Sequence, residues 1–191
     1  MRKNLKRESK VNNKPHKFIA EYSKSAFRHT NGVLTPTICL QKIMSGDGSL
    51  FIDHMWFNYN SNLRKIGELN PGDTVEFKAS VRTYHKGHGY SKMDYKLSDP
   101  KSVKLLEDRF QVPLPMSKKL MIGYVLIKNH ISLQSAKEDY AGEYMEWAKA
   151  EAIKIKNKIL TEWLGKGKAK MRNTWILFFF IENSAGENTG F

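Results

Sequence analysis

The stretch Thr74–Tyr84, with the sequence TVEFKASVRTY, alternates apolar and polar residues more cleanly than any other part of the chain. Its apolar set occupies every second position: Val75, Phe77, Ala79 and Val81. Because successive side chains of a β-strand point to opposite faces, this period of two predicts a strand with one buried and one exposed face. The fold must therefore contain a β-sheet with a hydrophobic core on one side.

Four more strands and a short helix are predicted around this strand. Three strands precede it, at 16–28, 33–44 and 50–59, and a fifth follows it at 91–97 and 101–106, broken by Asp99-Pro100. Asn31-Gly32 is a strong signal for a tight turn between the first two strands. Leu63, Ile66 and Leu69 recur every three residues, which predicts one or two helical turns within 62–69.

The element order over residues 16–106 is strand, strand, strand, short helix, strand, strand. Together with the entry Pro71-Gly72-Asp73-x-Val75-x-Phe77 into the fourth strand, it resembles the OB-fold, a small five-stranded barrel that many nucleic-acid-binding proteins use. The resemblance covers about half of the chain and rests on element order and one turn. It implies that the loops between strands one and two and between strands four and five flank a ligand groove.

The rest of the chain has a different character. We predict an extended connector at residues 111–115. We also predict a strand or buried segment at Leu120–Ile127 and a fully buried strand at 175–181. Apolar residues at helical spacing, after a Ser135-x-x-Glu138 capping box, predict a helix from 135 to 164, stopped by Gly165. We therefore predict an α+β protein with four parts: a basic flexible tail at 1–15, an OB-like barrel at 16–106, an extension with a long helix and one or two strands at 107–181, and a flexible tail at 182–191.

Charge is the most informative part of the composition. The chain has 32 Lys and Arg against 19 Asp and Glu, a formal net charge of +13. Clustered cations favour a polyanionic partner, because phosphates release counterions on meeting them. Simple solubility or a general lysine bias is the alternative explanation. The basic segment 1–15 is either a solvated tail or an arm that orders on a phosphate backbone.

Other features of the sequence exclude several classes of protein. Cys39 is the single cysteine, so an internal disulfide and a thiolate-rich zinc site are both excluded. The charged N-terminal residues do not form a signal peptide, and the longest apolar run, 175–181, is shorter than the roughly 20 residues that cross a bilayer. We expect a cytoplasmic protein without membrane association.

The residues for catalysis or metal binding are few. His85 and His88, with His54 or Asp53, could ligate zinc, but a glycine-rich loop does not hold such ligands in place. There is no nucleophile elbow and no P-loop spacing. We predict no enzyme activity, no cofactor and no metal, with a metal-dependent nuclease using Asp53 and Glu76 as the alternative.

Nucleic-acid binding has more support. A non-specific single-strand binder needs cations along a groove and flat side chains on which bases stack. The loop YHKGHGY at 84–90 has both, and Gly87 and Gly89 would let its aromatic side chains close over a strand as a clamp. The alternative is a glycine-rich hairpin tip whose tyrosines pack on the barrel. The predicted binding residues are Arg28, His29, Lys78, Arg82, Tyr84, His85, Lys86, His88, Tyr90, Lys92, Lys166, Lys168, Lys170 and Arg172.

These observations lead to one expected function and one rival. The first is binding of single-stranded nucleic acid, DNA slightly ahead of RNA, by charge and base stacking. The rival is an interaction protein, such as a viral or mobile-element inhibitor, that binds an acidic partner or occupies a nucleic-acid channel. Self-association through Trp147, Ile155 and Trp163 of the 135–164 helix fits either. Among Trp56, Phe57 and Tyr59, which lie on both faces of the third strand, we expect at least one to be exposed or covered by that helix.

Overall fold

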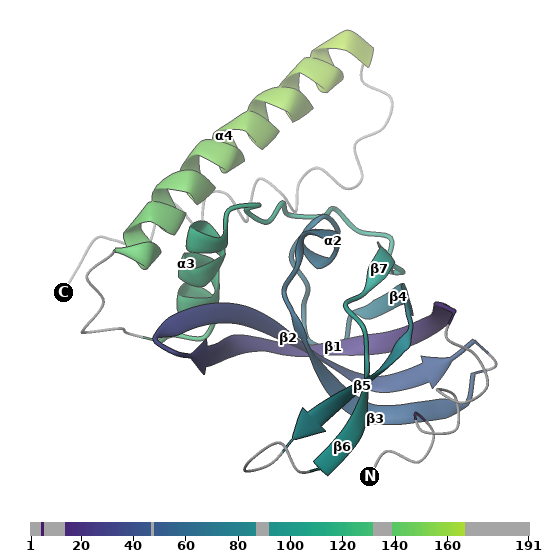
Figure 1. The fold of residues 1–191 in the computed structure, drawn as a ribbon. Helices are drawn as coiled ribbons and strands as arrows, with labels where there is room; N and C mark the ends of the chain where they lie inside the picture. The colour runs from purple at the N-terminus through teal and green to yellow at the C-terminus, as the bar shows by residue number, and fades with distance from the viewer. Residues whose placement is uncertain (1–4, 6–13, 47, 87–91, 132–138, 167–191) are drawn as a thin grey trace. The chain divides into compact units, whose positions relative to one another are not determined.

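A computed structural model describes residues 5, 14–46, 48–86, 92–131 and 139–166 of the chain (Figure 1). The side chains of 86 and 162–166 are outside this description. The chain divides into two compact units, residues 1–144 and 145–191. The sheets, the two shorter helices and the first turn of the long helix belong to the first unit, and the rest of the long helix belongs to the second.

The first unit is built on a five-stranded antiparallel sheet with the strand order β3-β2-β1-β4-β7. Its strands are β1 (His16–Thr30), β2 (Val33–Ser45), β3 (Leu50–Asn58), β4 (Thr74–Ala79) and β7 (Lys101–Leu105). A separate two-stranded hairpin consists of β5 (Val81–Lys86) and β6 (Lys92–Leu97). The helices are α2 (Ser61–Arg64), α3 (Lys118–Lys128) and α4 (Tyr140–Lys166). The α+β class and the strands predicted at 16–28, 33–44 and 50–59 are confirmed, whereas the predicted fifth strand is two strands, β6 and β7, that belong to different sheets.

The core lies on one face of the sheet, as the alternation in 74–84 predicts. Val75, Phe77, Ala79 and Val81 are all buried. The Phe77 ring stacks on Phe18 of β1 with centroids 5.7 Å apart and meets the edge of a β3 phenylalanine, Phe57, at 5.8 Å. We call the opposite face of the five-stranded sheet the outer face.

The single strand predicted for 74–84 is interrupted at Ser80, which is buried between two buried neighbours. The Ser80 N–H donates to Ser98 Oγ at 2.9 Å, and the Ser98 N–H donates to the Ser80 carbonyl at 2.7 Å. After this point β5 leaves the main sheet and pairs only with β6 among the described residues.

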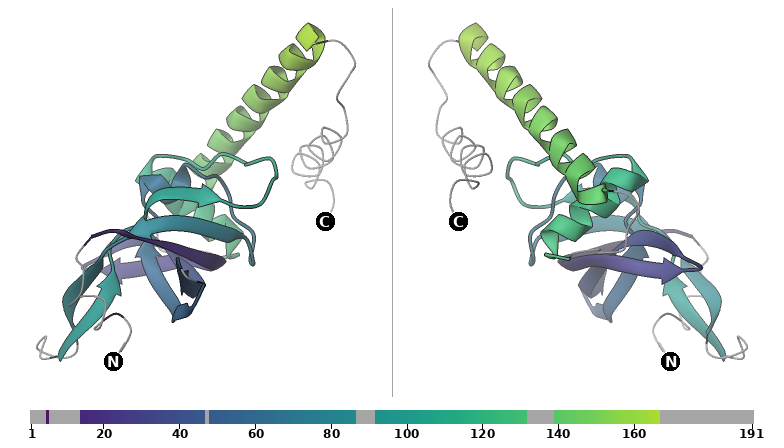
Figure 2. Two further views of the ribbon diagram at one scale, coloured as in Figure 1. Left: turned by 90° about the vertical axis from the view of Figure 1, so that its right-hand side faces the viewer. Right: turned by 90° about the vertical axis from the view of Figure 1, so that its left-hand side faces the viewer.

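The five-stranded barrel predicted for 16–106 is therefore not formed. Within the described ranges no ladder joins β3 at one edge to β7 at the other, so the sheet is open. Figure 2 shows the hairpin β5–β6 extending from the sheet, away from α3. The alternation of apolar residues continues unbroken through Ser80, so the sequence does not show this break.

The Leu120–Ile127 segment forms most of α3, and the strand considered for it is wrong. Six consecutive residues, Met121–Leu126, are buried. A run that is buried on every side has no period that separates a helix from a strand. A Cβ atom added at Gly123 would collide with Tyr140 and Tyr144, so α3 lies against the first turn of α4.

The long helix begins later than predicted. Asp139 caps α4, because its Oδ1 accepts the Gly142 N–H at 2.8 Å. The helix also continues through Gly165, which was predicted to stop it. The capping box at 135–138, the 175–181 strand and the tail at 182–191 lie outside the described residues. Within the 1–15 segment, Leu5 is described and is fully buried in the core. None of the described helices is both long and apolar enough to cross a membrane.

Candidate nucleic-acid interface

Three lysines form a row directly across three neighbouring strands. In the ladders Lys17 of β1 lies opposite Lys78 of β4, which in turn lies opposite Lys101 of β7. Phe18 and Phe77, the neighbours of the first pair, face the core. Because side chains alternate along a strand, the three lysines belong to the outer face.

A bulge in β7 adds a fourth lysine to the same place. Glu76 pairs with Lys104 and Lys78 with Lys101, so β7 has one more residue than β4 between these pairs. Ser102, inside that interval, has a φ of 49°, in the left-handed region. Residues three apart on a regular strand point to opposite faces. The extra residue in β7 therefore brings both Lys101 and Lys104 to the outer face. We call Lys17, Lys78, Lys101 and Lys104 the lysine row.

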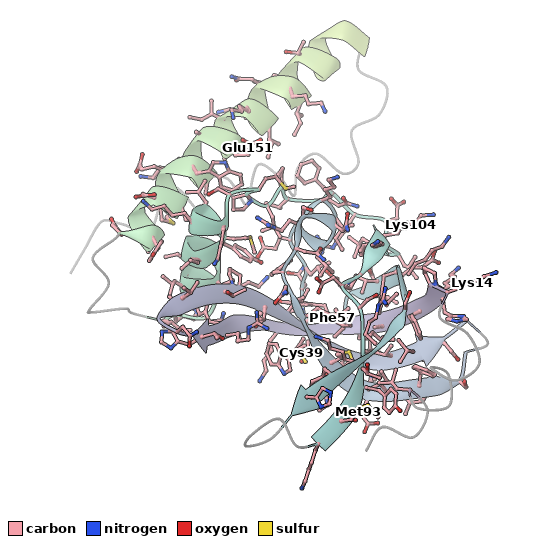
Figure 3. The ribbon with its side chains drawn as sticks, viewed as in Figure 1. Lys14, Cys39, Phe57, Met93, Lys104 and Glu151 are labelled. Atoms are coloured by element: carbon pink, nitrogen blue, oxygen red, sulfur yellow. The ribbon has the colours of Figure 1, made fainter. Side chains whose placement is uncertain are left out.

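Among the described residues, Glu76 is a carboxylate that pairs with the lysine row. Lys17 Nζ lies 2.6 Å from Glu76 Oε2. The hydrogen bond from Lys17 is the main reason why the pKa of the Glu76 carboxyl lies below its ordinary value, with smaller electrostatic contributions from Lys104 and Lys78. Lys78 and Lys101 are exposed next to each other. Figure 3 shows Lys104 at the outside of this end of the first unit, on the same side as Lys14.

The hairpin β5–β6 carries a second group of cations. Arg82 lies opposite Lys96, and Tyr84 opposite Asp94, so these side chains share one face. Lys96 Nζ lies 5.5 Å from the centroid of the Tyr84 ring, a cation–π contact. Tyr84 is half-buried, whereas Arg82, Lys96 and Lys92 are exposed. The hairpin thus combines a tyrosine with cations, but a lysine already lies over that tyrosine ring.

The remaining predicted site residues are dispersed or outside the description. His85 is exposed and pairs with Met93, so it lies on the other face of the hairpin from Tyr84. Arg28 and His29 are exposed near the end of β1, at the β1–β2 turn, which lies apart from the hairpin in Figure 1. The side chains outside the described residues are those of Lys86, His88, Tyr90, Lys166, Lys168, Lys170 and Arg172.

The aromatic residues of β3 separate as expected, with one of them exposed. Phe57 and Tyr59 are buried in the core, and Trp56 is 43% exposed. Trp56 pairs with Cys39 of β2, which pairs with Lys24 of β1. Leu40 and Met55, the neighbours of this row, are buried in the core, so Trp56 belongs to the outer face.

Sequence reasoning identified Lys78 but missed Lys17, Lys96, Lys101 and Lys104. The alternation in 74–84 is enough to place Lys78 opposite the core. Lys17 of β1 and Lys101 of β7 become neighbours of Lys78 only through strand register, and the bulge brings Lys104 to the same face. Lys96 of β6 lies opposite Arg82 in the hairpin, again through register. The available signal was the lysines on four of the five strands predicted within 16–106, which does not indicate which of them would meet.

The potential metal ligands among the described residues lie apart from one another. Among them no three His, Cys, Asp or Glu side chains are close enough to hold a metal ion. Asp53 of β3 and Glu76 of β4 are separated by β2 and β1 in the sheet, three strand spacings of about 4.8 Å, or roughly 14 Å. The carboxylate pair considered for a nuclease is therefore not formed.

A comparison with models of known protein families, with curated proteins and with solved structures finds no match for this chain.

Proposed function

We propose that this protein binds single-stranded nucleic acid, with DNA slightly preferred over RNA, along the outer face of its sheet. The observation that supports this most directly is the lysine row. Its four ammonium groups share one face across three strands, with one carboxylate, Glu76, between them. A phosphate backbone laid across this row would neutralise several charges at once and release its counterions.

The row also has a cost for folding that a ligand would remove. Like charges directly opposite each other on neighbouring strands destabilise a sheet by about 0.2–1 kcal/mol per pair. The chain contains two such pairs in succession, Lys17 with Lys78 and Lys78 with Lys101. Lys104, which the bulge brings to the same face, lies opposite Glu76, and its charge is one of those that lower the pKa of that carboxyl. Such an arrangement suits a protein whose working state includes a polyanion.

We also propose that the fold is related to the OB-fold and that the protein binds its ligand without catalysing a reaction. An OB-fold is a partly open five-stranded barrel, and the order strand, strand, strand, short helix, strand, strand is present here in an open sheet. Binding by charge and stacking uses no cofactor and no reaction. A cytoplasmic location, where nucleic acids are available, goes with this proposal.

The experiment is a titration of a fluorescently labelled thymidine oligonucleotide, followed by anisotropy at about 50 and about 200 mM salt. The test variant is Lys78→Gln with Lys101→Gln. The control, Lys118→Gln together with Lys65→Gln, removes the same charge from exposed positions outside the lysine row. The slope of log affinity against log salt should fall by about 1.4 in the test variant, since each phosphate contact contributes about 0.7 for a single strand.

A second readout of these variants is their thermal stability. The test variant should melt at the same or a slightly higher temperature than the parent, because a like-charge pair is removed. Weaker binding without loss of stability would support the lysine row as the phosphate site. The proposal is wrong if the parent does not bind at the lower salt concentration, or if both variants keep the parent's salt slope.

A specific observation also favours the rival function, a protein partner. The connector between β7 and α3 has four exposed apolar side chains, Leu106, Phe110, Val112 and Met116. Its backbone is held in place, since the Glu68 N–H donates to the Val112 carbonyl at 2.8 Å and Arg64 donates to the Met116 carbonyl at 2.6 Å. Exposed apolar side chains on a fixed segment are typical of an interaction surface.

The rival function is tested by a complex that survives high salt. A stoichiometric complex of this kind, lost in Phe110→Ser, together with no oligonucleotide affinity in the parent, would favour the protein partner. Phe110→Ser should leave oligonucleotide binding unchanged if the lysine row is the functional surface.

A further inference from the structure

The outer face has a second feature besides its lysines, an exposed indole. Trp56 is 43% exposed, whereas Trp147, the other tryptophan whose side chain is described, is half-buried. Tryptophan is a large apolar side chain, and its exposure on a regular strand leaves a flat surface in contact with water. Phe57 and Tyr59 on the same strand are buried, so Trp56 is not part of the core.

The residues next to Trp56 across the sheet are a small side chain and, one strand further, a cation. Its neighbour on β2 is Cys39, a small residue that is 5% exposed, and burial raises the pKa of that thiol. One strand further, Lys24 is exposed and close enough to Cys39 to oppose that rise. His54, two residues before Trp56, is exposed as well. An exposed indole flanked by a small side chain and near a cation is suited to a stacked base and its phosphate.

We propose that Trp56 is a base-stacking platform, and that Lys24 contacts the phosphate next to the stacked base. This inference rests on the proposed function, because it assigns a further subsite on the same face. The faces of bases in a duplex are already stacked on one another, so an indole can take only an unpaired base. Trp56 thereby gives the site its preference for single strands, which the lysine row alone does not supply.

The geometry of the sheet adds a requirement on the length of the ligand. Lys17 and Lys24 lie seven residues apart on β1, which is roughly 20 Å at about 3.3 Å per residue. The platform and the lysine row therefore lie at different points along the same face. One oligonucleotide reaches both only if it has several nucleotides, in line with site sizes of about 4–16 nucleotides for OB-folds.

The experiment compares Trp56→Leu with Trp56→Phe. Leucine keeps an apolar side chain beside Cys39 but cannot stack, whereas phenylalanine keeps a ring. The matched control is Phe110→Leu, which removes an exposed aromatic ring from the connector instead of the outer face. The probes are labelled thymidine oligonucleotides of two and of twelve residues and a labelled duplex of mixed sequence. Each probe is titrated with the whole chain, under conditions in which thermal melting shows that the variant is folded.

Trp56→Leu should weaken binding of the longer oligonucleotide about 5- to 100-fold. Trp56→Phe and Phe110→Leu should stay close to the parent. Affinity for the duplex should not change in Trp56→Leu, so the preference for the longer single strand over the duplex should fall by the same factor. The dinucleotide is too short to reach both the platform and the lysine row, and it should bind the parent more weakly than the longer oligonucleotide does.

The possible failures are distinguishable. Parent-like binding of the longer oligonucleotide by Trp56→Leu overturns the stacking platform and leaves the proposed function intact. An equal loss for single strand and duplex also overturns it, since a stacking residue acts only on unpaired bases. If the parent binds none of the three probes at low salt, the proposed function and the platform are both wrong.

Discussion

At the scale of single residues, the same strand contributes to the core and to the lysine row. Phe77 of β4 contacts the rings of Phe18 and Phe57, and its sequence neighbour Lys78 lies in the lysine row on the other face. The two roles are separable, because a change on one face of a strand need not alter the other. Stability and binding should therefore respond to different positions of β4.

Phe77→Ala is expected to lower the free energy of unfolding by about 3–5 kcal/mol, since a buried ring is replaced by a cavity between two other rings. Urea unfolding followed by circular dichroism measures this loss. Lys78→Gln, measured alongside, should change the free energy of unfolding by less than about 1 kcal/mol. A loss below about 1 kcal/mol in Phe77→Ala would show that position 77 is not part of the core.

At the scale of elements, α3 is attached to the sheet by one lysine as well as by apolar packing. Lys128 Nζ donates to Glu68 Oε1 at 2.8 Å and to the Leu69 carbonyl at 2.6 Å. It also lies 5.6 Å from the ring centroid of Tyr22 and 5.5 Å from that of Tyr124. This ammonium group therefore joins the end of α3 to β1 and to the segment that leads into β4.

Lys128→Met should lower the free energy of unfolding by about 1–3 kcal/mol. The Leu69 carbonyl loses its lysine donor, and the half-buried Glu68 carboxylate loses its ion pair but keeps the hydrogen bond from the Tyr124 hydroxyl at 3.2 Å. Lys119→Met is the matched control on the same helix. Lys119 pairs with Glu143 at 2.7 Å in a more exposed position, and its replacement should cost less than about 0.5 kcal/mol. Equal costs for the two variants would contradict a structural role specific to Lys128.

At the scale of the whole first unit, four tyrosines make its stability depend on pH in the alkaline range. Tyr59 and Tyr124 meet edge to face with ring centroids 6.5 Å apart, and Tyr124 and Tyr144 meet in the same way at 5.7 Å. Burial raises the pKa of the Tyr59, Tyr124 and Tyr22 hydroxyls above their ordinary value, and it raises the pKa of Tyr144 to about 12. These rings connect β1, the end of β3, α3 and the first turn of α4.

The sign of the pH effect follows from these shifts. In the unfolded chain the tyrosines lose their protons near pH 10, and in the folded chain they hold them to higher pH. Their contribution to stability is therefore complete below about pH 10 and is lost as the pH rises through the folded-state pKa values. Urea unfolding from about pH 8 to about pH 11 should show a constant midpoint and then a steep fall.

Tyrosinate absorbance during the same alkaline titration is the control for this assignment. Part of the tyrosinate absorbance should appear only when the chain unfolds. A full tyrosinate signal near pH 10 in a chain that is still folded would contradict the burial of these hydroxyls.

Local pattern by itself determined most of the strands and their faces. The period of two in 74–84 is sufficient to place Phe77 in the core and Lys78 outside it, because strand geometry links spacing to direction. The Asn31-Gly32 turn and the short helix near Leu63 follow equally from local chemistry. The basic composition, with its implied polyanionic partner, is likewise a property of the sequence alone.

Tertiary structure decided which of these elements meet. Ser80 ends β4 without interrupting the apolar alternation, since the break depends on its two hydrogen bonds to Ser98 across the hairpin. The helical form of α3 depends on burial by neighbours on every side, which removes the periodic signal. The lysine row and the exposed Trp56 exist only through register, because strand pairing and a bulge at Ser102 bring together residues that are far apart in the chain.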